Sequence, residues 1–328
     1  MSTGALKVFA LNSGREYGES VCRELGVPLA AHEERVFEDG EHKSRSLVSV
    51  RGGDVYVVQS LYGDAQQSVD DKLMRVLLFV GALKDASAAR VTVVAPYLAY
   101  SRKDQKSKVR DPVTTRYIAS FFEAAGADCM VTMDVHNLAA YQNAWRCRTE
   151  HLEAAPLFVR HVLPMLGAAD VVVVSPDAGG IKRADAFRQR LARALGRPLD
   201  MAFAEKYRSG GEIRGEALVG DVAGKVAIIV DDLISAGNTI ARAARACRER
   251  GAVRVIACAS HGVFATDANA VLADAAIDEI VVTDSIPPLR IADAGVAARI
   301  RQVATAPLFA DAIRRLHAGD SLVEIEGN

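Results

Sequence analysis

Nine short segments of almost unbroken apolar residues recur along the chain, separated by polar or amphipathic stretches. They are Val8–Leu11, Val55–Gln59, Val91–Ala95, Met130–Met133, Val171–Val174, Met201–Ala204, Val226–Val230, Val255–Ala259 and Ile280–Val282. Continuous apolar runs are typical of strands covered on both faces, as in parallel sheets, whereas strands with one solvated face alternate apolar and polar residues. The pattern therefore predicts parallel sheets buried between layers of helices.

Helical periodicity fills the stretches between several of these runs. In Asp71–Ala86, for example, Leu73, Val76 and Val80 fall on one face of a helix. Similar patterns cover Thr115–Ala125, Ala184–Leu195 and Thr239–Arg250. Strand and helix in repeated alternation predict an α/β fold with two doubly wound, mainly parallel sheets.

The length of 328 residues is enough for about two domains. The alternation of strand and helix patterns is interrupted at 140–155, so we expect domains at 1–152 and 153–306, with 307–328 packing back on the first. Arg208–Glu216 combines glycines with charges of both signs and predicts a long loop.

Composition excludes several classes of protein. Lys and Arg number 40 against 41 Asp and Glu, a net charge of −1, which argues against nucleic acid or membrane binding driven by bulk charge. No apolar run approaches the roughly 20 residues of a membrane span, and the N-terminus lacks a leader pattern, so a cytoplasmic protein is expected. The five cysteines form no CxxC pair and are predicted to be reduced structural thiols.

The strongest motif for chemistry is Lys225–Thr239, KVAIIVDDLISAGNT. A buried strand leads into Asp231 and Asp232, and a short loop then opens a helix, so backbone N–H groups and the helix dipole converge there. This loop, Ser235, Ala236, Gly237, Asn238 and Thr239, predicts a phosphate site. The two carboxylates are suited to accept hydrogen bonds from two vicinal hydroxyls, which ribose 5-phosphate presents. An ordinary Asp N-cap is the alternative, but a cap needs only one acceptor.

A second motif, Val171–Arg183, follows the same plan. Its strand ends at Asp177, and Ala178, Gly179 and Gly180 expose backbone before Lys182 and Arg183 open the next helix. Exposed backbone followed by basic residues is suited to a diphosphate, with Asp177 able to hold Mg²⁺. Taken alone, a strand before a Gly-rich turn is common and could equally be structural.

Together with four further segments, these motifs resemble the ribose-phosphate diphosphokinase family, the PRPP synthetases. The segments are VFEDGE at Val36–Glu41, PYLAYSRKD at Pro96–Asp104, MDVH at Met133–His136 and IRRLHAGDS at Ile313–Ser321. They occur in the order expected for that family and span nearly the whole chain. The resemblance implies phosphoribosyltransferase-like domains and an Mg²⁺-dependent transfer of the diphosphoryl group of ATP to ribose 5-phosphate.

The resemblance also implies roles for individual residues. ATP would be bound by Arg102, Lys103 and Asp104, and by Phe37, Asp39 and Glu41 of a neighbouring subunit, which makes a homo-oligomer expected. Mg²⁺ would be bound by His136, Asp134 and Asp177. Lys206 and Arg208 would be the catalytic cations on a loop that closes over the diphosphate. Ribose 5-phosphate would be bound by Asp177, Asp231, Asp232 and the loop 235–239.

The chain departs from the family pattern at several positions. Ala236 stands where members of the archaeal type carry Thr, Asn238 where they carry Gly, and Lys103 where a Gln is expected. Ala236 lacks a hydroxyl donor for the 5-phosphate. The segments Asn137–Arg148 and Ser321–Ile325 do not match those that help form the allosteric phosphate and ADP site of the common class. The chain is therefore expected to be a divergent member without that site.

Three other functions stay open from the sequence. The chain could be a catalytically weak homologue that acts as a regulatory subunit, but Lys206, Arg208, His136 and Asp177 are all present. It could be a phosphoribosyltransferase that consumes PRPP, although such an enzyme has no need of the ATP-serving motifs. It could also use a variant sugar phosphate acceptor, because Ala236 changes the phosphate loop.

Overall fold

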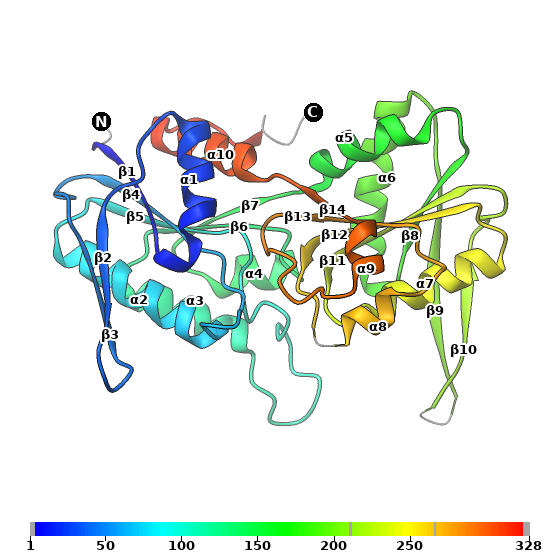
Figure 1. Cartoon of the computed structure of the whole chain (residues 1–328), viewed down its shortest axis with the longest axis horizontal. Coiled ribbons are helices and arrows are strands. Elements are labelled where there is room, and N and C mark those ends of the chain that lie inside the picture. Colours follow the sequence, from blue (N-terminus) through cyan, green and yellow to red (C-terminus); the bar gives the residue numbers. More distant parts are fainter. Residues whose placement is uncertain (1–3, 210–211, 266, 324–328) are drawn as a thin grey trace. The chain divides into compact units, whose positions relative to one another are not determined.

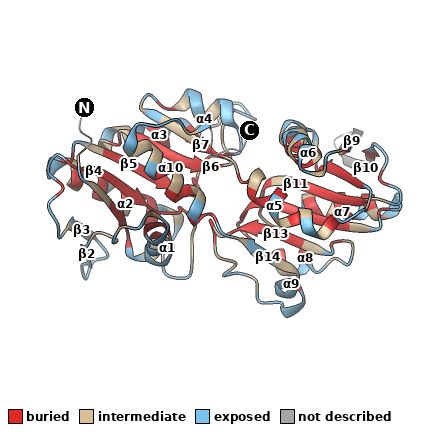
Figure 2. Cartoon of the chain, turned by 90° about the horizontal axis from the view of Figure 1, so that it is seen from above, coloured by how far each residue is buried: buried red, intermediate tan, exposed pale blue. Residues whose placement is uncertain are grey.

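The computed structural model describes residues 4–209, 212–265 and 267–323, with side chains described outside 205–217. The chain divides into two compact units, one of Met1–Glu153 with Thr305–Asn328 and one of Ala154–Ala304. In each unit the buried residues concentrate in the strands, as the red ribbons of Figure 2 show. No helix in the described part of the chain is long and apolar enough to cross a membrane.

The first unit is built on a parallel five-stranded sheet. Its strands, in spatial order, are β1 (Leu6–Ala10), β4 (Asp54–Val58), β5 (Arg90–Ala95), β6 (Cys129–Met133) and β7 (Arg148–Leu152). Helices α1 (Arg15–Leu25) and α10 (Ala306–Ala318) cover one face, and α2 (Val69–Asp85) and α3 (Thr114–Ala125) cover the other (Figure 1). A separate antiparallel hairpin joins β2 (His32–Val36) to β3 (His42–Ser46), and α4 (Leu138–Ala144) follows β6.

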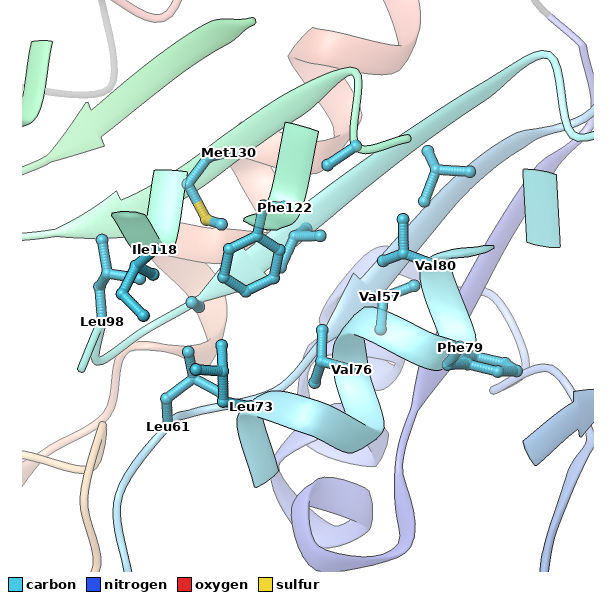
Figure 3. Packing of buried hydrophobic residues seen from close by; sticks show 14 of the residues in the cluster. Val57, Leu61, Leu73, Val76, Phe79, Val80, Leu98, Ile118, Phe122 and Met130 are labelled. Atoms are coloured by element: carbon cyan, nitrogen blue, oxygen red, sulfur yellow. The ribbon is translucent and has the colours of Figure 1, made fainter. Parts of the chain in front are cut away.

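The core of this unit lies between the sheet and the pair α2 and α3. Figure 3 shows Val76 of α2 and Phe122 of α3 on the side of strand residues such as Val57 and Met130. The ring of Phe79 of α2 packs on Phe9 of β1, with ring centres 5.4 Å apart. All of these side chains are fully buried. Burying large apolar side chains of this kind contributes about 1.5–3 kcal/mol each, so this face of the sheet is a major source of the unit's stability.

The C-terminal helix is tied to the first unit by a polar network. Arg90 Nε donates to Asp54 Oδ1 at 2.6 Å, and Arg90 Nη2 donates to the carbonyl of Leu316 in α10 at 3.0 Å. His317 Nδ1 lies 2.8 Å from the second carboxylate oxygen of Asp54. Because Asp54 is buried, one carboxylate at the start of β4 holds both a neighbouring strand and the distant helix.

The second unit contains a seven-stranded sheet. Its strands, in spatial order, are β10 (Glu212–Val219), β9 (Asp200–Ser209), β8 (Val171–Ser175), β11 (Val226–Ile234), β12 (Arg254–Gly262), β13 (Glu279–Thr283) and β14 (Ile300–Val303). All neighbours are parallel except β9 and β10. Helices α5 (Ala155–Leu166) and α6 (Ile181–Leu195) lie on one face, and α7 (Asn238–Glu249) and α8 (Ala268–Leu272) on the other, while α9 (Ala294–Arg299) precedes β14 (Figure 1).

The predicted α/β class with helices on both faces of mainly parallel sheets is confirmed, and all nine predicted strands and four predicted helices are present. The prediction of a loop at Arg208–Glu216 is wrong for most of that segment, because Arg208 lies in β9 and 212–216 lie in β10. These two strands form an antiparallel hairpin, in which backbone hydrogen bonds outweigh the glycines and charges that suggested a loop.

Candidate functional site

In the second unit, the strand order reverses between β8 and β11, and the carboxyl ends of these two strands are therefore the expected place for a ligand. The chain leaves β8 for β9 on one side and later crosses to β11 on the other side of β8. In open parallel sheets, ligands bind outside the carboxyl ends of the strands where the order reverses in this way. The two motifs that the sequence singled out, after β8 and in β11, are the ones that meet at this point.

Two adjacent carboxylates stand at this position and share one cation. Strand β11 continues through Asp231 and Asp232 to Ile234, so both acids are part of the strand and not beyond its end. Arg183 of α6 places Nη1 3.4 Å from Asp231 Oδ1 and 3.2 Å from Asp232 Oδ1. The sequence predicted that Arg183 serves a diphosphate; in the structure it links the two motifs through its contacts with both acids.

The environment of the pair opposes full ionisation. Burial raises the pKa of Asp231, and the adjacent Asp232 raises it further, by hydrogen bonding and by charge repulsion. Arg183 lowers that pKa again but only in part, so it stays well above the ordinary value of an aspartate. A group with a strongly shifted pKa at the carboxyl edge of a parallel sheet is a candidate for function.

The loop after β11 is compact and ends at the N-terminus of α7. Gly237 has a φ of 89°, which a residue with a side chain rarely adopts, and a Cβ there would lie 2.6 Å from Leu272 Cδ2 of α8. The loop is therefore wedged against α8, and its last residues, Asn238 and Thr239, already belong to the 12-residue helix α7. A helix start beside exposed loop backbone provides the N–H donors that phosphate requires.

Asp177 closes the loop after β8 on itself. Its Oδ1 accepts hydrogen bonds from Gly179 N–H at 2.9 Å and Gly180 N–H at 3.1 Å, and it caps the short 3₁₀ turn Ala178–Gly180. The backbone donors that the sequence predicted for a diphosphate are thus occupied by this carboxylate. No hydrogen bond from a described residue reaches its other oxygen, Oδ2.

In the first unit, two of the predicted segments follow adjacent strands and are joined directly. Asp104 lies after β5, and its Oδ2 accepts a hydrogen bond from Nδ2 of Asn137, which lies after β6, at 2.7 Å. Asn137 also caps α4 through Oδ1 and Ala140 N–H, at 3.1 Å. Asp134 adopts a φ of 39°, a costly conformation for a residue with a side chain, and His136 beside it is exposed. Asn137 was not among the predicted residues.

Lys103 is engaged within its own loop. Its Nζ lies 2.5 Å from Asp111 Oδ2 and 2.7 Å from Ser107 Oγ. Hydrogen bonds from Lys103, Ser107 and the N–H of Lys108 lower the pKa of Asp111 to about 2, so this carboxylate stays ionised beside the lysine. The extra positive charge predicted for Lys103 is therefore neutralised locally, whereas Arg102 is exposed.

The turn between β2 and β3 carries Phe37, Asp39 and Glu41. Phe37 N–H donates to Glu41 O at 2.7 Å, and Glu41 N–H donates to Asp39 Oδ1 at 3.0 Å. Phe37 is 39% exposed, with the Arg35 guanidinium 5.1 Å from its ring centre. Within the described residues, no hydrogen bond or ion pair joins this turn to residues 102–104.

The predicted catalytic residues Lys206 and Arg208 lie on β9, but their side chains fall outside the described part of the structure. Among the described residues, no three His, Cys, Asp or Glu side chains are grouped so as to hold a metal ion. The candidate metal ligands are instead Asp177 in the second unit and, as a separate pair, Asp134 and His136 in the first. One carboxylate with a free oxygen fits Mg²⁺, which usually takes one or two protein carboxylates plus phosphate and water ligands.

Comparisons with known proteins agree across the chain. Residues 6–126 match a family described as the N-terminal domain of ribose phosphate pyrophosphokinase, and residues 213–325 match a phosphoribosyl synthetase-associated domain. A ribose-phosphate pyrophosphokinase of Caldanaerobacter subterraneus is 38% identical, covering 98% of both chains, and one of Listeria ivanovii is 38% identical over 97% of this chain and 96% of its own. The crystal structure of phosphoribosylpyrophosphate synthetase from Mycobacterium smegmatis matches 96% of this chain and 99% of its own, at 34% identity and a TM-score of 0.85.

The raised pKa of Asp231 predicts how stability depends on pH. The folded protein binds this proton more tightly than the unfolded chain, so the free energy of unfolding should fall as pH rises from about 4 toward the raised pKa. Asp231→Asn removes this effect and should increase stability at pH 7–8 by on the order of 1 kcal/mol. Urea denaturation of the wild type and the variant across this pH range measures the difference.

Asp221 offers a control of opposite sign. It is exposed, and Lys225 Nζ, 3.0 Å away, lowers its pKa. Asp221→Asn should therefore leave stability unchanged or slightly reduced at pH 7–8. Equal destabilisation by both substitutions would contradict the argument for Asp231.

Proposed function

The chain belongs to the ribose-phosphate pyrophosphokinase family, and on this premise we propose that it is a diphosphotransferase of nucleotide biosynthesis. It transfers the diphosphoryl group of ATP to the C1 hydroxyl of ribose 5-phosphate and forms 5-phosphoribosyl 1-diphosphate and AMP. The observation that carries this proposal for the chain itself is the acidic pair Asp231 and Asp232 beside the loop 235–239, at the point where the strand order reverses.

The acceptor sugar fits this arrangement by its chemistry. Two vicinal hydroxyls of ribose 5-phosphate can donate to Asp231 and Asp232, while the 5-phosphate accepts from the backbone of Ser235, Ala236, Gly237 and Asn238 and from Thr239. Hydrogen bonds to the ionised form lower the pKa of a carboxyl group, so sugar binding should favour the charged pair. The Ala178–Gly180 turn is the proposed diphosphate site, with Asp177 moving off its N–H groups.

ATP is assigned to the first unit. The proposed contacts are Arg102 with the phosphates, Asp104 and Lys103 beside them, and the turn of Phe37, Asp39 and Glu41 on the base and ribose of ATP bound to a neighbouring subunit. Magnesium is the proposed metal, with Asp134, His136 and Asp177 as candidate ligands, and it would neutralise phosphate charge during transfer. Attack at the β-phosphorus needs positioning and charge neutralisation, and Lys206 and Arg208 are proposed to supply positive charge.

A homo-oligomer is part of this proposal. Met74 and Leu78 of α2, and Tyr117 and Phe121 of α3, are each about half exposed on adjacent helices of the first unit. Apolar side chains gathered in this way are typical of a contact surface, and a second copy of the chain is the proposed occupant. Within the described residues, no hydrogen bond or ion pair joins the turn 37–41 to residues 102–104, which agrees with a role of that turn in a partner's site.

The central test measures AMP formation from ATP and Mg²⁺ with and without ribose 5-phosphate, at several concentrations of inorganic phosphate. We expect AMP to form only with ribose 5-phosphate. Its rate should respond little to phosphate, because residues 137–148 and 321–325 do not match the segments that help form the usual allosteric site. A folded, ATP-binding protein that forms no AMP would contradict the proposal and favour a regulatory subunit. AMP formation with another pentose phosphate only would indicate a variant acceptor.

The loop residue Ala236 generates a second prediction. Ala236→Thr adds a hydroxyl donor for the 5-phosphate, and a hydrogen bond to a charged group contributes about 1.5–3 kcal/mol. The KM for ribose 5-phosphate should fall by about tenfold, with the KM for ATP unchanged. Ala236→Val, which adds similar bulk without a hydroxyl, is the matched control. A fall in KM with Val as well would reject the hydroxyl as the cause.

The shared ATP site can be tested by mixing two inactive variants. Lys206→Ala removes a proposed cation, and Phe37→Ala combined with Asp39→Ala disables the turn. If the turn serves a neighbouring subunit, each mixed pair contains one intact site, and random pairing should restore about a quarter of wild-type activity. A turn that served its own subunit would leave every mixed site defective, and activity would stay at the level of the separate variants.

A further inference from the structure

The segment after β12 is joined to the start of the proposed phosphate loop by two backbone hydrogen bonds. Phe264 N–H donates to the carbonyl of Ile234 at 3.0 Å, and Ala265 N–H donates to the carbonyl of Ser235 at 3.0 Å. Both acceptors lie where β11 passes into the loop, and neither donor belongs to β11, to the loop or to α7. The start of the loop is therefore attached to a segment about 30 residues away in sequence.

These two bonds determine which way the loop's own donors face. In a trans peptide unit, the carbonyl and the N–H of the following residue point in opposite directions. Because the carbonyls of Ile234 and Ser235 face residues 264 and 265, the N–H groups of Ser235 and Ala236 face the other way. The bonds thus direct two backbone donors away from the supporting segment, toward the side where the proposed phosphate site lies.

The support itself is held in an unusual conformation. Phe264 has a φ of 45°, in the left-handed region that bulky residues rarely adopt and that costs on the order of 1–3 kcal/mol. Such a conformation persists only when its surroundings enforce it. The side chain of Phe264 is completely buried, and its ring packs so closely on Gly262 that a Cβ there would lie 2.5 Å from the ring.

The end of β12 is also joined by a hydrogen bond to the segment that follows the neighbouring strand β13. His261 Nδ1 lies 2.8 Å from Ser285 Oγ, just beyond β13, and both side chains are buried. Ser285 Oγ in turn lies 2.9 Å from Thr283 Oγ1, at the end of β13. Because the neighbouring strand fixes His261, strain at Phe264 cannot relax by simple displacement of the strand end.

We propose that Phe264, locked in a left-handed conformation against Gly262, is a positioning residue for the phosphate loop and thereby sets the affinity for the 5-phosphate. This inference rests on the proposed function, since it assigns a role within the same ribose 5-phosphate site. The residue touches no substrate; it acts through the carbonyls of Ile234 and Ser235.

Gly262→Ala tests the proposal because its Cβ would displace the Phe264 ring and, with it, the two supporting hydrogen bonds. We expect the KM for ribose 5-phosphate to rise about tenfold, because a loss of affinity of this size corresponds to the loss of roughly one hydrogen bond to a charged group. The kcat at saturating ribose 5-phosphate and the KM for ATP should change less than twofold. Isothermal titration with ribose 5-phosphate alone should show the same loss of affinity without turnover.

Two further variants separate positioning from general damage. In Gly262→Ala with Phe264→Leu, the shorter side chain leaves room for the new Cβ, and the KM for ribose 5-phosphate should return toward the wild-type value. Gly81→Ala, in α2 of the first unit, is the matched control, since its Cβ would meet only an ordinary contact at 3.9 Å. Both KM values of this control should stay unchanged.

The outcomes distinguish this inference from the proposed function. A wild-type enzyme without ribose 5-phosphate-dependent AMP formation would defeat the proposed function itself. An active wild type with an unaltered KM in Gly262→Ala would overturn the positioning role alone. Equal loss of affinity for ATP and ribose 5-phosphate, or no rescue by Phe264→Leu, would likewise overturn it and indicate a purely structural role.

Discussion

The burial of two adjacent carboxylates at the end of β11 is the constraint on which the rest of the second unit depends. Removing charge from water is costly, and two like charges side by side make it more so. The guanidinium of Arg183 faces both Asp231 and Asp232, but it lowers the pKa of Asp231 only in part, so that pKa stays raised. In the proposed ribose 5-phosphate site, hydroxyl donors from the sugar would favour the ionised form of the pair.

The position of Arg183 in turn explains the Gly-rich turn before α6. Helix α6 must begin directly after β8 for its third residue, Arg183, to reach the neighbouring strand. The turn Ala178–Gly180 achieves this start in three residues, with Asp177 as its cap. The segment that looks like a phosphate motif in the sequence therefore has a structural role, because Asp177 accepts hydrogen bonds from the N–H groups of Gly179 and Gly180. These are the same N–H groups that the proposed diphosphate site would use.

The predictable parts of the fold are those that local pattern determines. The nine predicted strands are mostly apolar and buried, so local pattern identified them. The hairpin strands β2 and β3, HEERV and HKSRS, and the parallel edge strands β7 and β14, RTEHL and IRQV, are more polar and present no such signal. The site motifs were recognisable because strand, acid and small-residue loop are contiguous in sequence. The contact of Arg183 with both acids, the bond between Asp104 and Asn137, and the reversal of strand order all depend on which strands become neighbours. Which strands become neighbours depends on interactions throughout the sheet and cannot be predicted from any single segment.

The proposed phosphate loop, 235–239, illustrates why a site built on backbone donors can tolerate changes in its own sequence. Backbone N–H groups are present whatever the side chain, and their direction depends on the peptide planes. In this chain those planes are oriented by Phe264 and Ala265 on one side, and Leu272 packs against Gly237 on the other. A substitution such as Ala236 removes one side-chain donor but leaves this support intact. The conformation of the loop thus depends on Phe264, Ala265 and Leu272, which carry no phosphate motif, as well as on the loop's own residues.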